Sequence, residues 1–133
     1  MTSSNASMNV VEFHILKLSH VNVTVPAKAE AAAKEFYGTV LGLREIPKPA
    51  GTRQNVGAWF QLGGVQLHLS VEEEVRNAAS DRHICYVVLE LAVAERHLRD
   101  SGVEIISDPR PIAGVNRFYV RDPGGNLIEI TEA

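Results

Sequence analysis

GGVQLHL at residues 63–69 and GGNLIEI at residues 124–130 are two copies of one pattern, a glycine pair followed by a strand-like segment. A second matching pair precedes them, SHVNVTV at residues 19–25 and RHICYVV at residues 82–88. The glycine pairs lie 61 positions apart, and His20 and His83 lie 63 positions apart. Since the offset is almost constant, we interpret the chain as an internal duplication in which each copy folds in a similar way.

The first copy reads as a strand, a helix and two further strands. Residues 16–25 alternate valines with polar residues, which is the period of a strand. After Pro26, apolar residues recur at helical spacing as far as Gly42, a typical residue after a helix end. Residues 56–62 and 65–71 alternate again on either side of a glycine turn, so they predict two strands.

The second copy repeats this series. A strand is predicted from Arg82, then a helix that ends before Gly102, and then a segment broken by Pro109 and Pro111. Two more strands end the chain. We therefore expect one domain at residues 10–133, with halves at about 14–75 and 80–133, after a disordered tail at residues 1–9 that is small and polar.

Composition excludes several classes of protein. The 133 residues are 45% hydrophobic, which suits one compact domain. The net charge is −3 and the 13 Lys and Arg residues are scattered, so we expect no nucleic-acid partner. No apolar stretch approaches the roughly 20 residues of a membrane-spanning helix. With a single cysteine, Cys85, and no pattern of a secretory signal at the N-terminus, we expect a cytoplasmic location.

Each copy offers one metal-ligating residue from its first strand and one from its last. These are His20 and His68 in the first copy, and His83 and Glu129 in the second. Taken singly, His20 and His68 fit a solvent-exposed strand face, and His83 fits a half-buried histidine. Together, three nitrogens and one oxygen suit a divalent transition metal such as zinc, iron, nickel, cobalt or manganese.

Other side chains are candidates for substrate contact. Trp59 is expected on the same strand face as Gln61. It either lines a ligand pocket or packs in the core or at the edge of the sheet. Arg117 and Tyr119 share one strand face and either hold an anionic substrate or form a solvated face. We expect Cys85, which lies among apolar residues, to be a buried structural thiol.

From residue 16 to residue 131 the sequence resembles the vicinal-oxygen-chelate superfamily of glyoxalases, bleomycin-resistance proteins and extradiol dioxygenases. The most specific segments are SHVNVTV, FYGTVLGL, VQLHLSV, RHICYVV and FYVRDPGGNLIEI. The resemblance implies an α+β fold of two βαβββ modules, whose mostly antiparallel, curved sheets form a half-open, barrel-like cavity. It also implies that His20, His68, His83 and Glu129 occupy the positions of the metal ligands.

The resemblance further implies a metal-dependent enzyme, a lyase or isomerase that acts on a small substrate through two adjacent oxygens bound to the metal. Glu129, the single carboxylate of the ligand set, is then the expected general base. The resemblance also implies that, in a two-module chain, each site forms where one half of a subunit meets the other half of its partner. We therefore expect a homodimer in which each site takes His20 and His68 from one chain and His83 and Glu129 from the other.

Two alternatives stay open. The chain could be a metal-free module that binds a drug or an aromatic ligand, with Trp59, Phe118 and Tyr119 stacking on it. It could also be an Fe(II) dioxygenase of the extradiol type, because Phe118-Tyr119, Asp122-Pro123 and Glu129 match the motif of those enzymes.

Overall fold

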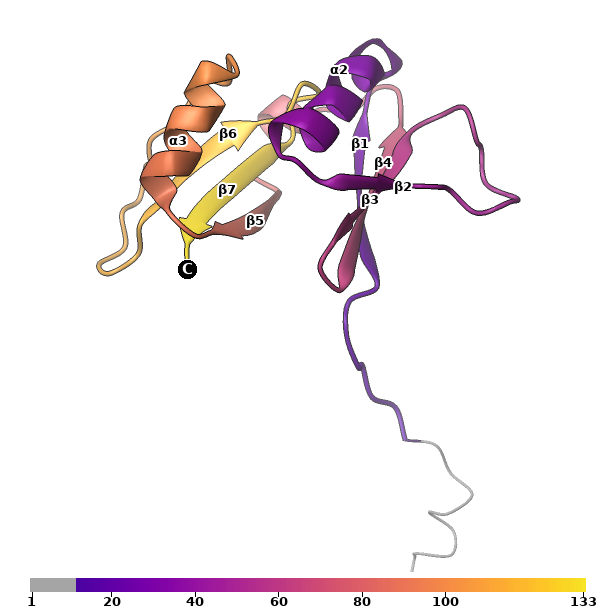
Figure 1. Ribbon diagram of the computed structural model, residues 1–133, viewed down its shortest axis with the longest axis horizontal. Helices are drawn as coiled ribbons and strands as arrows, with labels where there is room; N and C mark the ends of the chain where they lie inside the picture. The colour runs from indigo at the N-terminus through magenta and orange to yellow at the C-terminus, as the bar shows by residue number, and fades with distance from the viewer. Residues whose placement is uncertain (1–11) are drawn as a thin grey trace, which may run out of the picture.

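The computed structural model describes residues 12–133, which fold into two halves that lie side by side (Figure 1). The tail predicted at residues 1–9 lies outside the described residues. Within the described part, no helix combines the length and the apolar character that crossing a membrane requires.

The first half contains a four-stranded mixed sheet. Its elements are β1 (His20–Val25), η1 (Ala27–Ala29), α2 (Glu30–Glu35), η2 (Phe36–Val40), β2 (Arg44–Ile46), β3 (Ala58–Leu62) and β4 (Val65–Val71). The strand order is β1-β4-β3-β2, and only β1 and β4 are parallel. The predicted helix is present, but it is divided into a 3-10 turn, an α-helix and a π-helical turn.

The second half repeats the arrangement with three strands. After a short 3-10 turn, η3 (Asn77–Ala79), come β5 (His83–Val88), α3 (Leu91–Asp100), β6 (Arg117–Arg121) and β7 (Leu127–Glu132). The strand order is β5-β7-β6, with β5 parallel to β7 and β6 antiparallel to it. The predicted class, an α+β fold of two related modules, is confirmed.

The strands differ from the prediction in where the first one begins and in how many the second module contains. The strand expected from residue 16 begins only at His20, because its neighbour β4 starts just after the Gly63-Gly64 turn and offers no backbone partner further upstream. The counterpart of β2 in the second half is reduced to one bridge between Ile106 and Tyr119. Pro109 follows closely, and a proline cannot donate the hydrogen bond that a continuing strand needs.

Each sheet buries one face under helices. In the first half, Tyr37 of η2 packs over Phe60, with ring centroids 6.2 Å apart, and in the second half α3 lies along β7 (Figure 1). The buried faces carry Val25, Phe60, Leu67 and Leu69 in the first sheet and Phe118, Val120, Ile128 and Ile130 in the second. We call the opposite face of each sheet its site face, because the predicted site residues lie there.

Polar contacts join the two halves at one end. The Tyr37 hydroxyl donates a 2.6 Å hydrogen bond to Asp122 Oδ2, and the Asn126 side-chain amide donates to the carbonyl of Thr24 at 3.0 Å. Burial, together with Asp122, raises the pKa of Tyr37 strongly, so its hydroxyl stays protonated as a donor.

The same junction requires a glycine. A Cβ atom added to Gly124 would lie 2.3 Å from Val25 Cγ1 and 2.7 Å from Val25 Cβ. Gly124 therefore lets the turn between β6 and β7 pack directly on the end of β1.

Candidate metal-binding and substrate-binding site

Three aromatic rings stack on the site face of the first sheet. His68 of β4 lies between His20 of β1 and Trp59 of β3, since β4 is the strand between the other two. The centroid of the His68 ring is 4.1 Å from that of His20 and 3.7 Å from that of Trp59, with interplanar angles of 16° and 6°. The pairing of Trp59 with His68 across β3 and β4 produces this stack.

His68 is held more firmly than His20. Only 7% of His68 is exposed, and its Nε2 lies 2.9 Å from Gln66 Oε1. Burial, followed by the charges of His20 and Lys48, lowers the pKa of His68, so this imidazole is neutral at physiological pH and can ligate a metal. His20 is exposed, and its Nδ1 lies 3.1 Å from Ser19 Oγ.

The stack limits how both imidazoles could bind one ion. The nitrogen lone pairs lie in the ring planes, and in two nearly parallel rings they do not converge on one point. Sharing an ion therefore requires one ring to turn, and the exposed His20 has fewer contacts to lose than His68.

On the site face of the second sheet, His83 and Glu129 form a close pair. His83 Nε2 lies 3.1 Å from Glu129 Oε1, and His83 Nδ1 lies 2.8 Å from the carbonyl oxygen of Asp81. In the neutral imidazole, an Nδ1 that donates to Asp81 leaves Nε2 as an unprotonated donor atom directed at the carboxylate. An unprotonated imidazole nitrogen and a carboxylate that face each other can both bind the same cation.

Glu129 is surrounded by further polar groups. Its side chain is 11% exposed, with Arg117 Nη1 3.5 Å from Oε2 and the Tyr119 hydroxyl 3.5 Å from Oε1. Arg117 in turn donates through Nε to Asp108 Oδ2 at 2.8 Å and through Nη2 to the carbonyl of Arg110 at 3.0 Å. The hydrogen bond from Arg117 lowers the pKa of Asp108, so the ion pair stays formed at neutral pH.

Cys85 lies beside this pair, and its predicted burial is wrong. Cys85 is exposed, on the same face of β5 as His83, and pairs with Glu129 across the parallel strands. Burial of its thiol group and the neighbouring Glu129 raise the pKa of Cys85, which keeps it a thiol. Because Cys85 comes two residues after His83, strand alternation places both on one face, and this could have predicted its exposure. The apolar residues Val87 and Leu89 on that face instead suggested that it is buried.

The four predicted ligands therefore lie as two pairs, one on each sheet. Among residues 12–133 no three His, Cys, Asp or Glu side chains form a group that could hold a metal ion. Trp59 lies against the first pair, while Arg117 and Tyr119 lie against the second. Sequence reasoning did not single out Gln66, Asp108 or Arg110, which contact these residues only through the fold.

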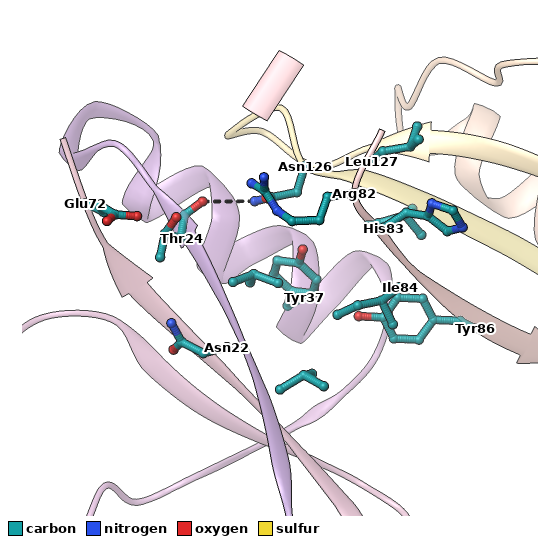
Figure 2. A pocket seen from close by; sticks show the side chains of 13 residues that line it. Asn22, Thr24, Tyr37, Glu72, Arg82, His83, Ile84, Tyr86, Asn126 and Leu127 are labelled. Carbon is teal, nitrogen blue, oxygen red and sulfur yellow. Dashed lines mark hydrogen bonds between the residues drawn. The ribbon is translucent and has the colours of Figure 1, made fainter. Parts of the chain in front are cut away.

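A cavity of about 460 Å³ separates the edge strands β1 and β5. Figure 2 shows side chains from both strands around it, and of the predicted ligands only His83 contributes to its lining. The Tyr86 hydroxyl, also in the lining, is buried without a hydrogen-bond partner among the described residues, and burial, followed by Asp122, raises the pKa of Tyr86 to about 12.

The sequence profile of the Glyoxalase/Bleomycin resistance protein/Dioxygenase superfamily matches residues 17–130. A glyoxalase family protein from Bacillus anthracis is 37% identical, with a TM-score of 0.79 over 92% of this chain and 98% of that one. A comparison with curated protein sequences finds no match.

Two more distant structures have the same fold. Lactoylglutathione lyase from Agrobacterium tumefaciens is 21% identical, with a TM-score of 0.67 over 88% of this chain and 93% of that one. The fosfomycin resistance protein FosX from Listeria monocytogenes is 19% identical, with a TM-score of 0.72 over 90% and 93% of the two chains. At these identities the likeness concerns the fold.

Proposed function

Because the chain belongs to the Glyoxalase/Bleomycin resistance protein/Dioxygenase superfamily, we propose that it is a metal-dependent lyase or isomerase acting on a small substrate with two adjacent oxygens. The observation that carries this proposal is the pair of His83 Nε2 and Glu129 Oε1, 3.1 Å apart. Two ligands each about 2.1 Å from a tetrahedral metal ion lie about 3.4 Å from each other, so this separation suits a shared ion.

The residues that would hold the metal are His20 and His68 of one chain with His83 and Glu129 of another. Imidazole nitrogens with one carboxylate oxygen suit zinc, iron, nickel, cobalt or manganese. When bound, such an ion supplies Lewis acidity toward the substrate oxygens.

Glu129 is the proposed general base, which removes a proton from the carbon next to the substrate oxygens. Its carboxylate is the acidic member of the set, and Arg117 lies near one oxygen while Tyr119 and His83 lie near the other. These contacts orient the carboxylate, which is what efficient proton transfer requires. Because the Arg117 guanidinium is already engaged with Asp108, we assign Arg117 to positioning Glu129 in place of the predicted substrate contact.

A homodimer would bring the two pairs together. Each pair has one member close to exposed apolar side chains, with Leu18, two residues before His20, 64% exposed and Val87, on the strand of His83, 65% exposed. Val87 lies on the same face of β5 as His83, so it extends the site face of the second sheet, while Leu18 lies two residues before the start of β1. Exposed apolar surface of this kind favours association with a second copy.

The first test is metal content. Protein purified without a chelator or a histidine tag should contain about one transition metal ion per chain. His20→Ala and His83→Ala should each lose the ion, while His14→Ala, which removes an exposed histidine whose partner among residues 12–133 is Glu12, should keep it. Absence of metal from the wild type after reconstitution would contradict the proposal.

Complementation tests whether the site is shared. When His20→Ala and His83→Ala are expressed together, a mixed dimer has one site with both substitutions and one site with neither. With random pairing, the mixture should recover about a quarter of the wild-type metal content per chain. If each site lay within one chain, mixing would recover none.

The stack of His20, His68 and Trp59 also supports a second candidate, a module that binds an aromatic ligand without metal. Trp59 is the single tryptophan of the chain, so its fluorescence reports directly on such binding. Quenching by aromatic compounds in a protein that takes up no metal would favour this candidate. Metal uptake with no quenching would exclude it.

A further inference from the structure

A second cavity, of about 200 Å³, adjoins the His83 and Glu129 pair. Site-face residues of the second sheet form one side of it, and the segment that follows the Ile106 bridge forms the other. The lining consists of Asp81, His83, Ile106, Pro109, Arg110, Tyr119, Arg121 and Leu127. His83 and Tyr119 both contact Glu129, so a molecule in this cavity lies next to the proposed base.

Two arginines give this cavity a positive character. Arg121 Nη1 donates to the carbonyls of Asn77 at 3.2 Å and Gly125 at 2.8 Å, and these oxygens are neutral, so its charge has no ionic partner among residues 12–133. The guanidinium of Arg110 has no hydrogen bond or ion pair with any residue in 12–133, although its backbone is fully engaged. Asp81 is the single acidic residue of the lining, so the positive charges outnumber the negative one.

The backbone of Arg110 is fixed by the groups that orient Glu129. Its amide donates to Asp108 Oδ1 at 3.0 Å, and its carbonyl accepts from Arg117 Nη2 at 3.0 Å. Asp108 and Arg117 form an ion pair of 2.8 Å, and Arg117 also contacts Glu129. The start of the Arg110 side chain is therefore held at a defined position relative to Glu129.

We propose that Arg110, assisted by Arg121, binds an anionic group of the substrate while the rest of the substrate reaches His83 and Glu129. A guanidinium matches the geometry of a carboxylate or a phosphate, with two parallel hydrogen bonds. The substrate class is then a small acid or phosphate-bearing compound that carries the two adjacent oxygens. This assignment deepens the proposed function and rests on it.

The test is a titration of the full-length protein with inorganic phosphate and, separately, with acetate, followed by amide NMR spectra. Either anion at millimolar concentration should shift the amide signals of Asp81, Arg110 and Tyr119. Arg110→Ala should weaken this binding about tenfold, the loss expected for one charged hydrogen-bonding partner. Tighter binding of phosphate would indicate a phosphate-bearing substrate, and tighter binding of acetate a carboxylate.

Arg96→Ala is the matched control. Arg96 is an exposed arginine of the same half, on α3, which covers the buried face of the sheet. Its removal changes the net charge equally and should leave the binding within about twofold. Equal weakening by Arg96→Ala and Arg110→Ala, or no binding by the wild type, would overturn the proposal.

The His20→Ala variant separates this proposal from the proposed metal site. His20 lies on the first sheet and does not line the cavity, so the variant should lose metal and keep the anion shifts. A wild type that takes up metal but binds no anion contradicts only the anion site. A wild type that binds anions at Arg110 but takes up no metal contradicts only the proposed metal dependence.

Discussion

The two halves of the chain have equivalent strands but different chemistry on their site faces. In the first half, His68 is paired across the sheet with Trp59 and stacks between Trp59 and His20. In the second half, the equivalent position is Glu129, paired across the sheet with Tyr119 and in contact with His83 and Arg117. One half thus presents a neutral, stacked imidazole, and the other an oriented carboxylate.

This difference shows that the duplicated topology sets the position of a side chain, whereas the neighbouring residues determine its chemical role. Burial lowers the pKa of His68 and keeps its imidazole neutral, with a nitrogen lone pair that can bind a metal. The arginine and tyrosine near Glu129 instead hold its side chain in a defined orientation. We therefore expect the second half to supply the proton transfer and the first half to supply neutral ligands and an aromatic wall.

The largest expected effect comes from Glu129→Gln, which removes the carboxylate that distinguishes the second half from the first. Turnover should fall by about 10²- to 10⁴-fold, the usual contribution of a general base, while much of the metal is retained through the amide oxygen. The measurement combines metal analysis with assays of 2-oxoaldehydes, acyl-CoA epimers and catechols. Glu104→Gln, which removes an exposed carboxylate of the same half, should change neither. Turnover retained in Glu129→Gln would remove Glu129 from the role of base.

The equivalent glycine turns of the two halves provide the next comparison. Gly124 is packed against Val25, whereas a Cβ atom on Gly64 would meet nothing within 4 Å, and neither residue has a positive φ. Gly124→Ala should lower the free energy of unfolding by about 1–3 kcal/mol through overpacking at the junction. Gly64→Ala should be neutral or stabilising by about 0.5 kcal/mol. Urea unfolding measures both, and equal effects would show that the turn packing does not join the halves.

The smallest expected effect concerns Tyr86, which occupies the position equivalent to Val23 in the duplication. Its pKa of about 12 exceeds the ordinary value of 10.0, because burial favours the neutral phenol. Between these two pH values the unfolded chain ionises at this residue and the folded chain does not, so stability falls as the pH rises. Tyr86→Phe should reduce that fall by at most about 1.4 kcal/mol per pH unit.

At pH 7 the Tyr86→Phe change should alter stability by less than about 1 kcal/mol, since the hydroxyl has no hydrogen-bond partner among the described residues. Denaturant unfolding at pH 7, 10 and 11 measures both effects. An unchanged alkaline slope in Tyr86→Phe would show that its hydroxyl ionises equally in the folded and unfolded chain.

Particular residues show how far the sequence could predict the site. The alternation around His68 and the duplication offset placed His68 and Glu129 on equivalent strands, whereas the fold class was predicted from the resemblance to a known family. Cys85 was misjudged because its apolar neighbours suggested a buried face, while the buried face of β5 is the one with Ile84 and Tyr86. β2 was missed because three residues are too few to show a period.

The sequence by itself determined the duplication and the alternation of side chains along each strand, because these depend on local spacing along the chain. Only the tertiary structure decided that Asp108 and Arg110 reach the surroundings of Glu129, that Gly124 packs on Val25, and that the predicted ligands lie as two separate pairs. These contacts join residues from different strands and loops. Their distances depend on how the chain folds back on itself, which no local pattern contains.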